Sequence, residues 1–299
     1  MSRVFIARLA LAALFLVPLC PQPAAAEPAC PAGGTIRYGV EPFEASDKLL
    51  PVYDQVAKAL QAKTGCNVEL YIATSYNAEI EAMRNDKLDV AEFGPLGYVL
   101  AHQIAHADVF ATYLDPSGKG PSVYYASIVT HKSSGLSSLK DVVGKSFAYS
   151  DPDSTSGHLF PAYALKAAGI DPDTGVKAVY AGSHTASFEA IKNDKVQAGE
   201  LNSLTIPVVS KTGEYDANDY VTLWKSPAIP NDPITIRRDL PDAVKSNIEK
   251  SFLALNLHTV DDPKNVLKGL GYGFVPQEDV SYNVIRDMVS TLKIDLSKL

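Results

Sequence analysis

The chain has 299 residues, of which 46% are hydrophobic, and a formal net charge of −7. This length suits two domains of ordinary size. An acidic protein repels nucleic acid and anionic membranes at long range, so the charge argues against both as partners. A site for an anion must then consist of oriented hydrogen-bond donors, because the overall charge opposes binding.

The N-terminus has the three parts of an export signal. A basic start, an apolar run and a stretch of small residues follow one another: Arg3 and Arg8, residues 9–17, and Ala24-Ala25-Ala26. This pattern predicts cleavage after Ala26 and a periplasmic protein. A membrane anchor is disfavoured, since the apolar run is shorter than the ~20 residues that span a bilayer. Lipidation at Cys20 is also disfavoured, because the bulky Leu19 precedes it.

Cleavage leaves 273 residues and two cysteines, Cys30 and Cys66. It also removes two arginines and no acid, which takes the net charge from −7 to −9. Each cysteine precedes a strand-like segment, 35–40 or 67–72. Disulfides persist in an oxidising compartment, and pairing of the two strands brings the cysteines within bonding distance. We therefore expect a Cys30–Cys66 disulfide, with free thiols or soft-metal ligation as alternatives.

Strand-like and helical patterns alternate in the first third of the mature chain. Strands are predicted at 36–40, 68–72 and 88–93, and helices at 50–64, 76–85 and from Gly94-Pro95 onward. In the first helix Val52, Val56 and Leu60 form an apolar stripe, and Gly65 ends it. This alternation indicates a parallel sheet covered by helices.

The pattern restarts after a loop at 115–121. Strands are predicted at 124–130, 146–150, 176–180 and 196–200, with a helical turn at 139–142 and helices at 156–168 and 185–193. From Ile234 the chain returns to the first domain and ends in helices near 243–257 and 280–292. We expect two lobes, 27–122 plus 233–299 and 123–232, with a ligand in the crevice between them.

The strongest local motif is the hydroxyl-rich turn at 151–158, between a predicted strand and a predicted helix. Ser154, Thr155 and Ser156 lie where a helix leaves its first N–H groups unpaired. Those N–H groups, the hydroxyls and the helix dipole favour a small oxyanion, and Gly157 leaves the backbone accessible. Helix capping is the alternative, because serine and threonine are common N-caps.

Two other strand-to-helix turns and a connector carry candidate residues. His184 follows Gly182-Ser183, and Tyr76 follows Thr74-Ser75. Either side chain can donate to a ligand, or can simply pack in the core. In the proline-spaced connector 225–233, Asp232 is held extended by Pro233, as a ligand contact or as a turn residue.

Signatures of catalysis are absent from the sequence. There is no G-x-S-x-G, Walker A, G-x-G-x-x-G or H-E-x-x-H motif, and the histidines lack metal-ligand spacing. We expect a binding protein without a cofactor or metal. The alternatives from other classes are a hydrolase that uses Ser156 and His184, and a scaffold with a vestigial cleft.

Taken together, these segments resemble the phosphate/phosphite/phosphonate-binding proteins of ABC importers, across nearly the whole mature chain. The D-P-x-S-T-S-G and K-S-P-x-I-P-x-D-P stretches are the most specific. The resemblance rests on blocks in a fixed order: Tyr76, residues 89–95, Tyr124-Tyr125, residues 151–157, residues 181–184 and residues 225–234. It implies a type II periplasmic-binding fold of two Rossmann-like lobes joined by a hinge.

The resemblance also implies the site and the partners. We expect a monomer that captures a small phosphorus oxyanion for an ABC permease; a sensory protein that signals to a membrane kinase, as in an arsenite-sensing branch, is an alternative. The implied contacts to the PO3 end are Tyr76, Tyr124, Ser154, Thr155, Ser156, His184 and Asp232. Because a carboxylate can only accept, Asp232 requires a protonated ligand, which favours phosphorus oxyanions over sulfate.

One position departs from the family pattern. Aminoethylphosphonate binders carry a glutamate for the ligand's amine at the position of Leu204. Its loss favours phosphite, methylphosphonate or phosphate as the ligand. An aminoalkylphosphonate stays open as the alternative, because Glu200 shares a face with Leu204 if the segment is helical.

Overall fold

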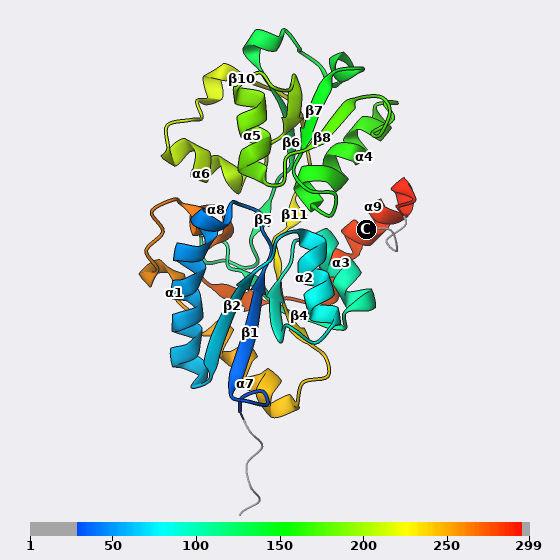
Figure 1. Ribbon diagram of the computed structural model, residues 1–299. Helices are drawn as coiled ribbons and strands as arrows, with labels where there is room; N and C mark the ends of the chain where they lie inside the picture. The colour runs from blue at the N-terminus through cyan, green and yellow to red at the C-terminus, as the bar shows by residue number, and fades with distance from the viewer. Residues whose placement is uncertain (1–28, 295–299) are drawn as a thin grey trace, which may run out of the picture.

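The computed structural model describes residues 29–294, which form two α/β lobes, one above the other in Figure 1. The predicted export signal, residues 1–26, lies outside the described residues. Within 29–294, no helix combines the length and the apolar character needed to cross a membrane.

The first lobe is built on a six-stranded sheet. Its order is β13 (Phe274–Pro276), β4 (Ala107–Tyr113), β12 (Pro233–Arg237), β3 (Val90–Glu92), β1 (Thr35–Val40) and β2 (Asn67–Ile72). Strands β3, β1 and β2 are parallel, whereas β12 runs antiparallel to both β3 and β4. The chain therefore returns from the second lobe into the middle of the first sheet.

The second lobe is built on a five-stranded sheet of the same kind. Its order is β10 (Tyr220–Lys225), β6 (Ser127–His131), β9 (Ala198–Glu200), β7 (Ser146–Tyr149) and β8 (Lys177–Tyr180). Strands β9, β7 and β8 are parallel. A small antiparallel ribbon of β5 (Val123–Tyr124) and β11 (Ile229–Pro230) lies between the two sheets, where the chain passes from lobe to lobe (Figure 1).

Helices cover both sheets. The first lobe holds α1 (Ser46–Thr64), α2 (Tyr76–Arg84), α3 (Pro95–Ile104), α7 (Asp242–Leu253) and α8 (Val266–Leu270), and α9 (Asn283–Leu292) packs on α3. The second lobe holds α4 (Phe160–Ala167), α5 (His184–Lys192) and α6 (Thr205–Lys211). Short 3-10 turns lie at 132–134, 139–142, 217–219, 257–259 and 279–282, and a π-helical turn spans Thr155–Leu159.

Most predicted elements are present, with shifted ends. Helix α1 starts at Ser46, earlier than predicted, and ends at Gly65, which adopts a left-handed conformation. The predicted strand 124–130 is divided into β5 and β6, and the helix predicted from Ser156 begins as the π-helical turn. Strands β4 and β10 were not predicted, because their burial does not alternate residue by residue.

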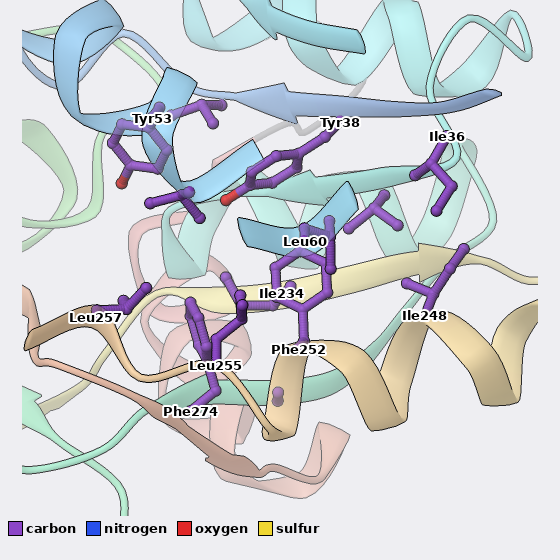
Figure 2. Close-up of a cluster of buried hydrophobic side chains, with 14 of the residues drawn as sticks. Ile36, Tyr38, Tyr53, Leu60, Ile234, Ile248, Phe252, Leu255, Leu257 and Phe274 are labelled. Atoms are coloured by element: carbon purple, nitrogen blue, oxygen red, sulfur yellow. The ribbon is translucent and has the colours of Figure 1, made fainter. Parts of the chain in front are cut away.

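The core of the first lobe anchors the returning chain. Ile234 on β12 packs among buried aromatic and aliphatic side chains from β1, α1, α7 and β13, as Figure 2 shows. Asp232 lies two residues earlier, and the hydroxyl of Thr112 donates to its carbonyl oxygen. The core thus fixes the backbone on which the Asp232 carboxyl group is mounted.

The predicted disulfide is confirmed. Cys30 and Cys66 are bonded, with their Cα atoms 5.6 Å apart. The bond joins the chain before β1 to the start of β2, where Thr35 and Asn67 are in register. The bond therefore fastens the segment before β1 to β2, the edge strand of the first sheet.

Candidate ligand site between the lobes

A cavity of about 430 Å³, part of which opens to solvent, lies between the two lobes. This volume lies near the lower end of the ~300–1,000 Å³ that is typical of small-molecule pockets, so the group that fits is small. All seven residues predicted to contact a ligand line this one cavity: Tyr76, Tyr124, Ser154, Thr155, Ser156, His184 and Asp232.

The parallel strands explain this convergence. Strands β1, β7, β8 and β9 each end close to the cavity, and the turn after each one supplies lining residues. The carboxyl ends of parallel strands share one edge of a sheet, where ligands of open α/β folds bind. The two sheets present these edges to each other across the cavity.

The hydroxyl-rich turn is partly a helix cap and partly a row of free donors. Ser154 is the N-cap of the π-helical turn, and its oxygen accepts from the Gly157 backbone N–H at 3.1 Å. A Cβ atom on Gly157 would lie 1.7 Å from the Ser150 hydroxyl, so only glycine fits there. Capping therefore occupies one lone pair of Ser154, whose proton stays available, and the hydroxyls of Thr155 and Ser156 have different partners.

Thr155 and Ser156 each accept a hydrogen bond from an N–H group. The Leu96 backbone N–H, at the start of α3 in the other lobe, donates to Thr155 Oγ1 at 2.8 Å. The side-chain amide of Asn202 donates to Ser156 Oγ at 3.2 Å. A hydroxyl group has a single proton, so both residues keep that proton for an acceptor in the cavity.

His184 is oriented by a buried carboxylate. Its Nδ1 lies 2.9 Å from Glu200 Oε1, and both side chains are buried. Burial lowers the pKa of His184, but the carboxylates of Glu200, Glu44 and Asp232 outweigh it and raise the pKa above the usual value. With Nδ1 bonded to Glu200, the other ring nitrogen, Nε2, is the one left for a ligand.

Glu200 does not restore the missing amine partner. It ends β9, and α6 begins only at Thr205, so Glu200 and Leu204 do not share a helical face. The Glu200 side chain is hydrogen-bonded to His184 and does not line the cavity. The condition under which Glu200 could replace a glutamate at 204 is therefore not met.

Asp232 and the two tyrosines stay protonated more readily than usual. Burial, followed by the nearby Glu92 carboxylate, raises the pKa of Asp232 well above its normal value, while His184 lowers it. Burial also raises the pKa values of Tyr76 and Tyr124 well above normal, so both phenols are hydrogen-bond donors. The cavity thus offers phenol, hydroxyl and imidazole donors to an oxyanion.

Four polar residues that line the cavity were not predicted from the sequence: Glu41, Glu44, Asn202 and Thr205. Burial, and then Asp232, raises the pKa of Glu41, which is itself buried. Both carboxyl oxygens of Glu44 are buried, without a hydrogen-bond partner among residues 29–294. Glu41 directly follows β1 and Asn202 lies two residues after β9, and this position at the end of a parallel strand is the signal that points to them; Glu44 lies further along the loop between β1 and α1.

Comparison with known proteins identifies the family. Residues 38–282 match the family described as "ABC transporter, phosphonate, periplasmic substrate-binding protein". The chain belongs to this family. As a phosphonate-family binding protein it delivers a ligand to an ABC transporter and is not an enzyme.

Relatives of this phosphonate-family protein match most of its length. It is 28% identical over 293 residues to the phosphonates-binding periplasmic protein of Escherichia coli K12, covering 96% of this chain and 85% of that one. It is 27% identical over 269 residues to a phosphate-import protein of Mycolicibacterium smegmatis, covering 84% of each chain. A binding protein of a phosphonate transporter from Pseudomonas aeruginosa has a TM-score of 0.74 at 28% identity, covering 85% of each chain. Together they confirm the type II periplasmic-binding fold.

The closed arrangement of the lobes depends on close backbone contacts at the rim of the cavity. The His184 backbone N–H donates to the Phe43 carbonyl at 3.2 Å, from one lobe to the other. On the same side, Gly269 of α8 faces Leu204 of the second lobe. A Cβ atom on Gly269 would lie 2.7 Å from the Leu204 carbonyl oxygen and 2.8 Å from its Cα.

Gly269→Ala is therefore expected to weaken ligand binding by about tenfold or more, because the added methyl group meets backbone and holds the lobes apart. Alanine favours a helix over glycine, so α8 itself is not expected to lose stability. Calorimetric titration gives the affinity, and small-angle scattering with ligand should show a larger radius of gyration. Lys268→Ala, at an exposed neighbour on α8, is the control, and equal affinities for the two variants would contradict this expectation.

Proposed function

We propose that the mature chain captures a small phosphorus oxyanion by its PO3 end in the cavity between the lobes. The observation that supports this most strongly is the convergence of seven residues, spread over 157 positions from Tyr76 to Asp232, on one small cavity. Their donors suit an anion. The carboxyl group of Asp232 can accept a hydrogen bond from a protonated oxygen of the ligand, so it suits an anion that can itself carry a proton.

The hydrogen bonds around the cavity give each group a role. Thr155 and Ser156 donate their hydroxyl protons to ligand oxygens, and His184 donates from Nε2 with a positive charge. The phenols of Tyr76 and Tyr124 donate from the two sides. Charge-assisted bonds of this kind are the strong ones, and they hold an anion although the whole protein is acidic.

The remaining wall of the cavity limits which substituent the phosphorus atom of the ligand can have. Leu204, Val208 and Val266 line it with aliphatic groups, together with the ring of Phe43. A methyl group or a hydrogen atom on phosphorus fits such a wall better than a fourth oxygen does, so among these ligands the wall favours methylphosphonate and phosphite over phosphate. The small volume and the leucine at position 204 support phosphite, methylphosphonate or phosphate.

The wider setting follows from the same proposal. The chain is exported by cleavage after Ala26 and works as a monomer. Residues 27–122 plus 233–299 form one lobe and residues 123–232 the other, and both close on the ligand about the β5–β11 ribbon. The closed form is then the one that docks on the ABC permease.

A calorimetric titration panel tests this function. The compounds are phosphite, methylphosphonate, phosphate, 2-aminoethylphosphonate and sulfate, each added to the mature protein. At least one of the first three should bind tightly, with sulfate at least a hundredfold weaker. Sulfate binding as tight as that of every phosphorus compound would contradict the proposal.

One observation favours the aminoalkylphosphonate as a second candidate. Glu44 is buried and lines the cavity next to the aliphatic wall, and within the described chain both of its carboxyl oxygens lack a hydrogen-bond partner. Lys48 Nζ lies 3.6 Å from one of these oxygens. A buried carboxylate with one ion-pair partner at this distance and no hydrogen bond is costly, and a ligand ammonium group would offset that cost. Glu44 would then replace the missing glutamate from the opposite lobe.

Glu44→Gln separates the two candidates. If the ligand carries an amine, the variant should lose about tenfold or more in affinity for 2-aminoethylphosphonate, because a charged partner is removed. Its affinity for methylphosphonate should stay the same or rise, since a negative charge leaves the cavity. Equal changes for both ligands would exclude Glu44 as an amine partner.

A further inference from the structure

Asn202 is held in a single orientation by the backbone that follows it. Its Oδ1 accepts from the backbone N–H groups of Leu204 and Thr205, each at 2.8 Å. An amide oxygen can accept these bonds and an amide nitrogen cannot, so the NH2 group must point the other way. That group lies 3.2 Å from Ser156 Oγ, and both side chains are almost fully buried.

This fixed amide controls the direction of the Ser156 hydroxyl. The amide N–H occupies a lone pair on Ser156 Oγ, so the hydroxyl cannot donate its proton back to Asn202. The proton is left for the cavity, which both residues line. A free serine rotates its hydroxyl among several acceptors, whereas this one is set as a donor before the ligand arrives.

We infer that Asn202 is a positioning residue for ligand specificity: it fixes Ser156 as a hydrogen-bond donor and so commits this wall of the cavity to an unprotonated oxygen of the ligand. The inference rests on the proposed function, because it assigns a ligand oxygen to Ser156. It also assigns the two ends of the anion. The deprotonated oxygens face Ser156 and the protonated oxygen faces Asp232.

The decisive substitution is Asn202→Asp. A carboxylate keeps the two acceptor contacts to the Leu204 and Thr205 N–H groups, so the turn before α6 is preserved. Its second oxygen can only accept, so it draws the Ser156 proton away from the ligand. We expect the affinity for methylphosphonate and for phosphate to fall by tenfold or more, with the melting temperature little changed.

A double-mutant cycle with Ser156→Ala tests whether Asn202 acts through Ser156. If it does, the double variant should lose about tenfold less affinity than the product of the two single losses. The double variant loses the Ser156 hydrogen bond once, and in addition it has the repulsion between the introduced carboxylate and the anion. Single losses that multiply fully would overturn the inference, because Asn202 would then act independently of Ser156.

The affinity of Asn202→Asp should depend on pH in a way that a purely structural role of Asn202 does not predict. A protonated carboxyl group can donate to Ser156 as the amide does, and burial raises the pKa of such a group. The affinity ratio of wild type to variant should therefore shrink as pH falls from about 8 to about 5. In the Ser156→Ala background the ratio should change much less, and recovery of equal size there would count against the inference.

The affinity of the wild-type protein shows whether a negative result concerns the role of Asn202 alone or also the proposed function on which it rests. Wild type that binds neither methylphosphonate nor phosphate overturns the proposed function and the inference with it. Wild type that binds, with Asn202→Asp equal to it in affinity, overturns the inference alone.

Discussion

Asp232→Asn is expected to lose tenfold or more in affinity for a protonated phosphorus oxyanion, because a hydrogen bond to a charged acceptor contributes ~1.5–3 kcal/mol. In the complex, one proton lies between this carboxyl group and the ligand. The amide can donate where the carboxylate repelled, so the variant should also bind sulfate better than wild type does. Calorimetric titrations with methylphosphonate and sulfate measure both changes.

The pH dependence provides a second comparison for Asp232. Burial and Glu92 raise the pKa of Asp232, so the empty site holds a proton at lower pH and loses it as pH rises. Above the pKa values of both groups, binding must take up a proton, and wild-type affinity should fall as pH rises, by up to about tenfold per pH unit. Asp232→Asn should show a weaker dependence, because Asp232 no longer titrates, whereas the ligand and His184 still do.

Glu41→Gln serves as the control for loss of a buried carboxyl group, since Glu41 lines the same cavity and interacts with Asp232. It should not gain affinity for sulfate as Asp232→Asn does. If Asp232→Asn binds methylphosphonate as tightly as wild type and still rejects sulfate, Asp232 has only a structural role.

Thr155→Ala and Ser156→Ala are each expected to lower ligand affinity by tenfold or more, with little change in the ligand-free melting temperature. Each removes a charge-assisted hydrogen bond to the anion, worth ~1.5–3 kcal/mol. Thr155→Ala should have the larger effect, because it also leaves the Leu96 N–H across the cleft without its acceptor. Titration calorimetry and thermal unfolding measure the two quantities separately.

Ser154→Ala is the matched control in the same turn. Its oxygen caps the π-helical turn through the Gly157 N–H, so its loss should cost stability, about 1 kcal/mol. Its effect on affinity should be smaller than that of Ser156→Ala. Unchanged dissociation constants for both Thr155→Ala and Ser156→Ala would show that these hydroxyls only shape the helix start.

Much of the fold could be predicted from the sequence, because the residue patterns that indicate helices and strands are local. The apolar stripe of Val52, Val56 and Leu60 and the stop at Gly65 describe α1 without reference to the rest of the protein. The order of strands and helices then indicates two lobes. Strands such as β4 and β10 were not predicted, since their burial depends on neighbouring strands in the sheet and does not follow an alternating pattern.

The candidate site was predictable where a motif placed several donors together, as in the turn with Ser154, Thr155 and Ser156. Asn202, by contrast, is a single polar residue whose role depends on two backbone N–H groups after it and a hydroxyl 46 positions before it. Glu92 is similar. It is buried in β3, accepts from three tyrosine hydroxyls, and burial raises its pKa to about 7 despite those bonds.

A crystal structure of the mature protein with methylphosphonate tests most directly whether a PO3 group binds between the hydroxyl-rich turn and Asp232. We expect phosphorus in the cavity between the lobes, with oxygens within hydrogen-bond distance of Thr155 Oγ1, Ser156 Oγ and His184 Nε2, and one oxygen against the Asp232 carboxyl group. Methylphosphonate bound elsewhere, or bound here with its methyl group against Ser156 and its oxygens against the aliphatic wall, would contradict it.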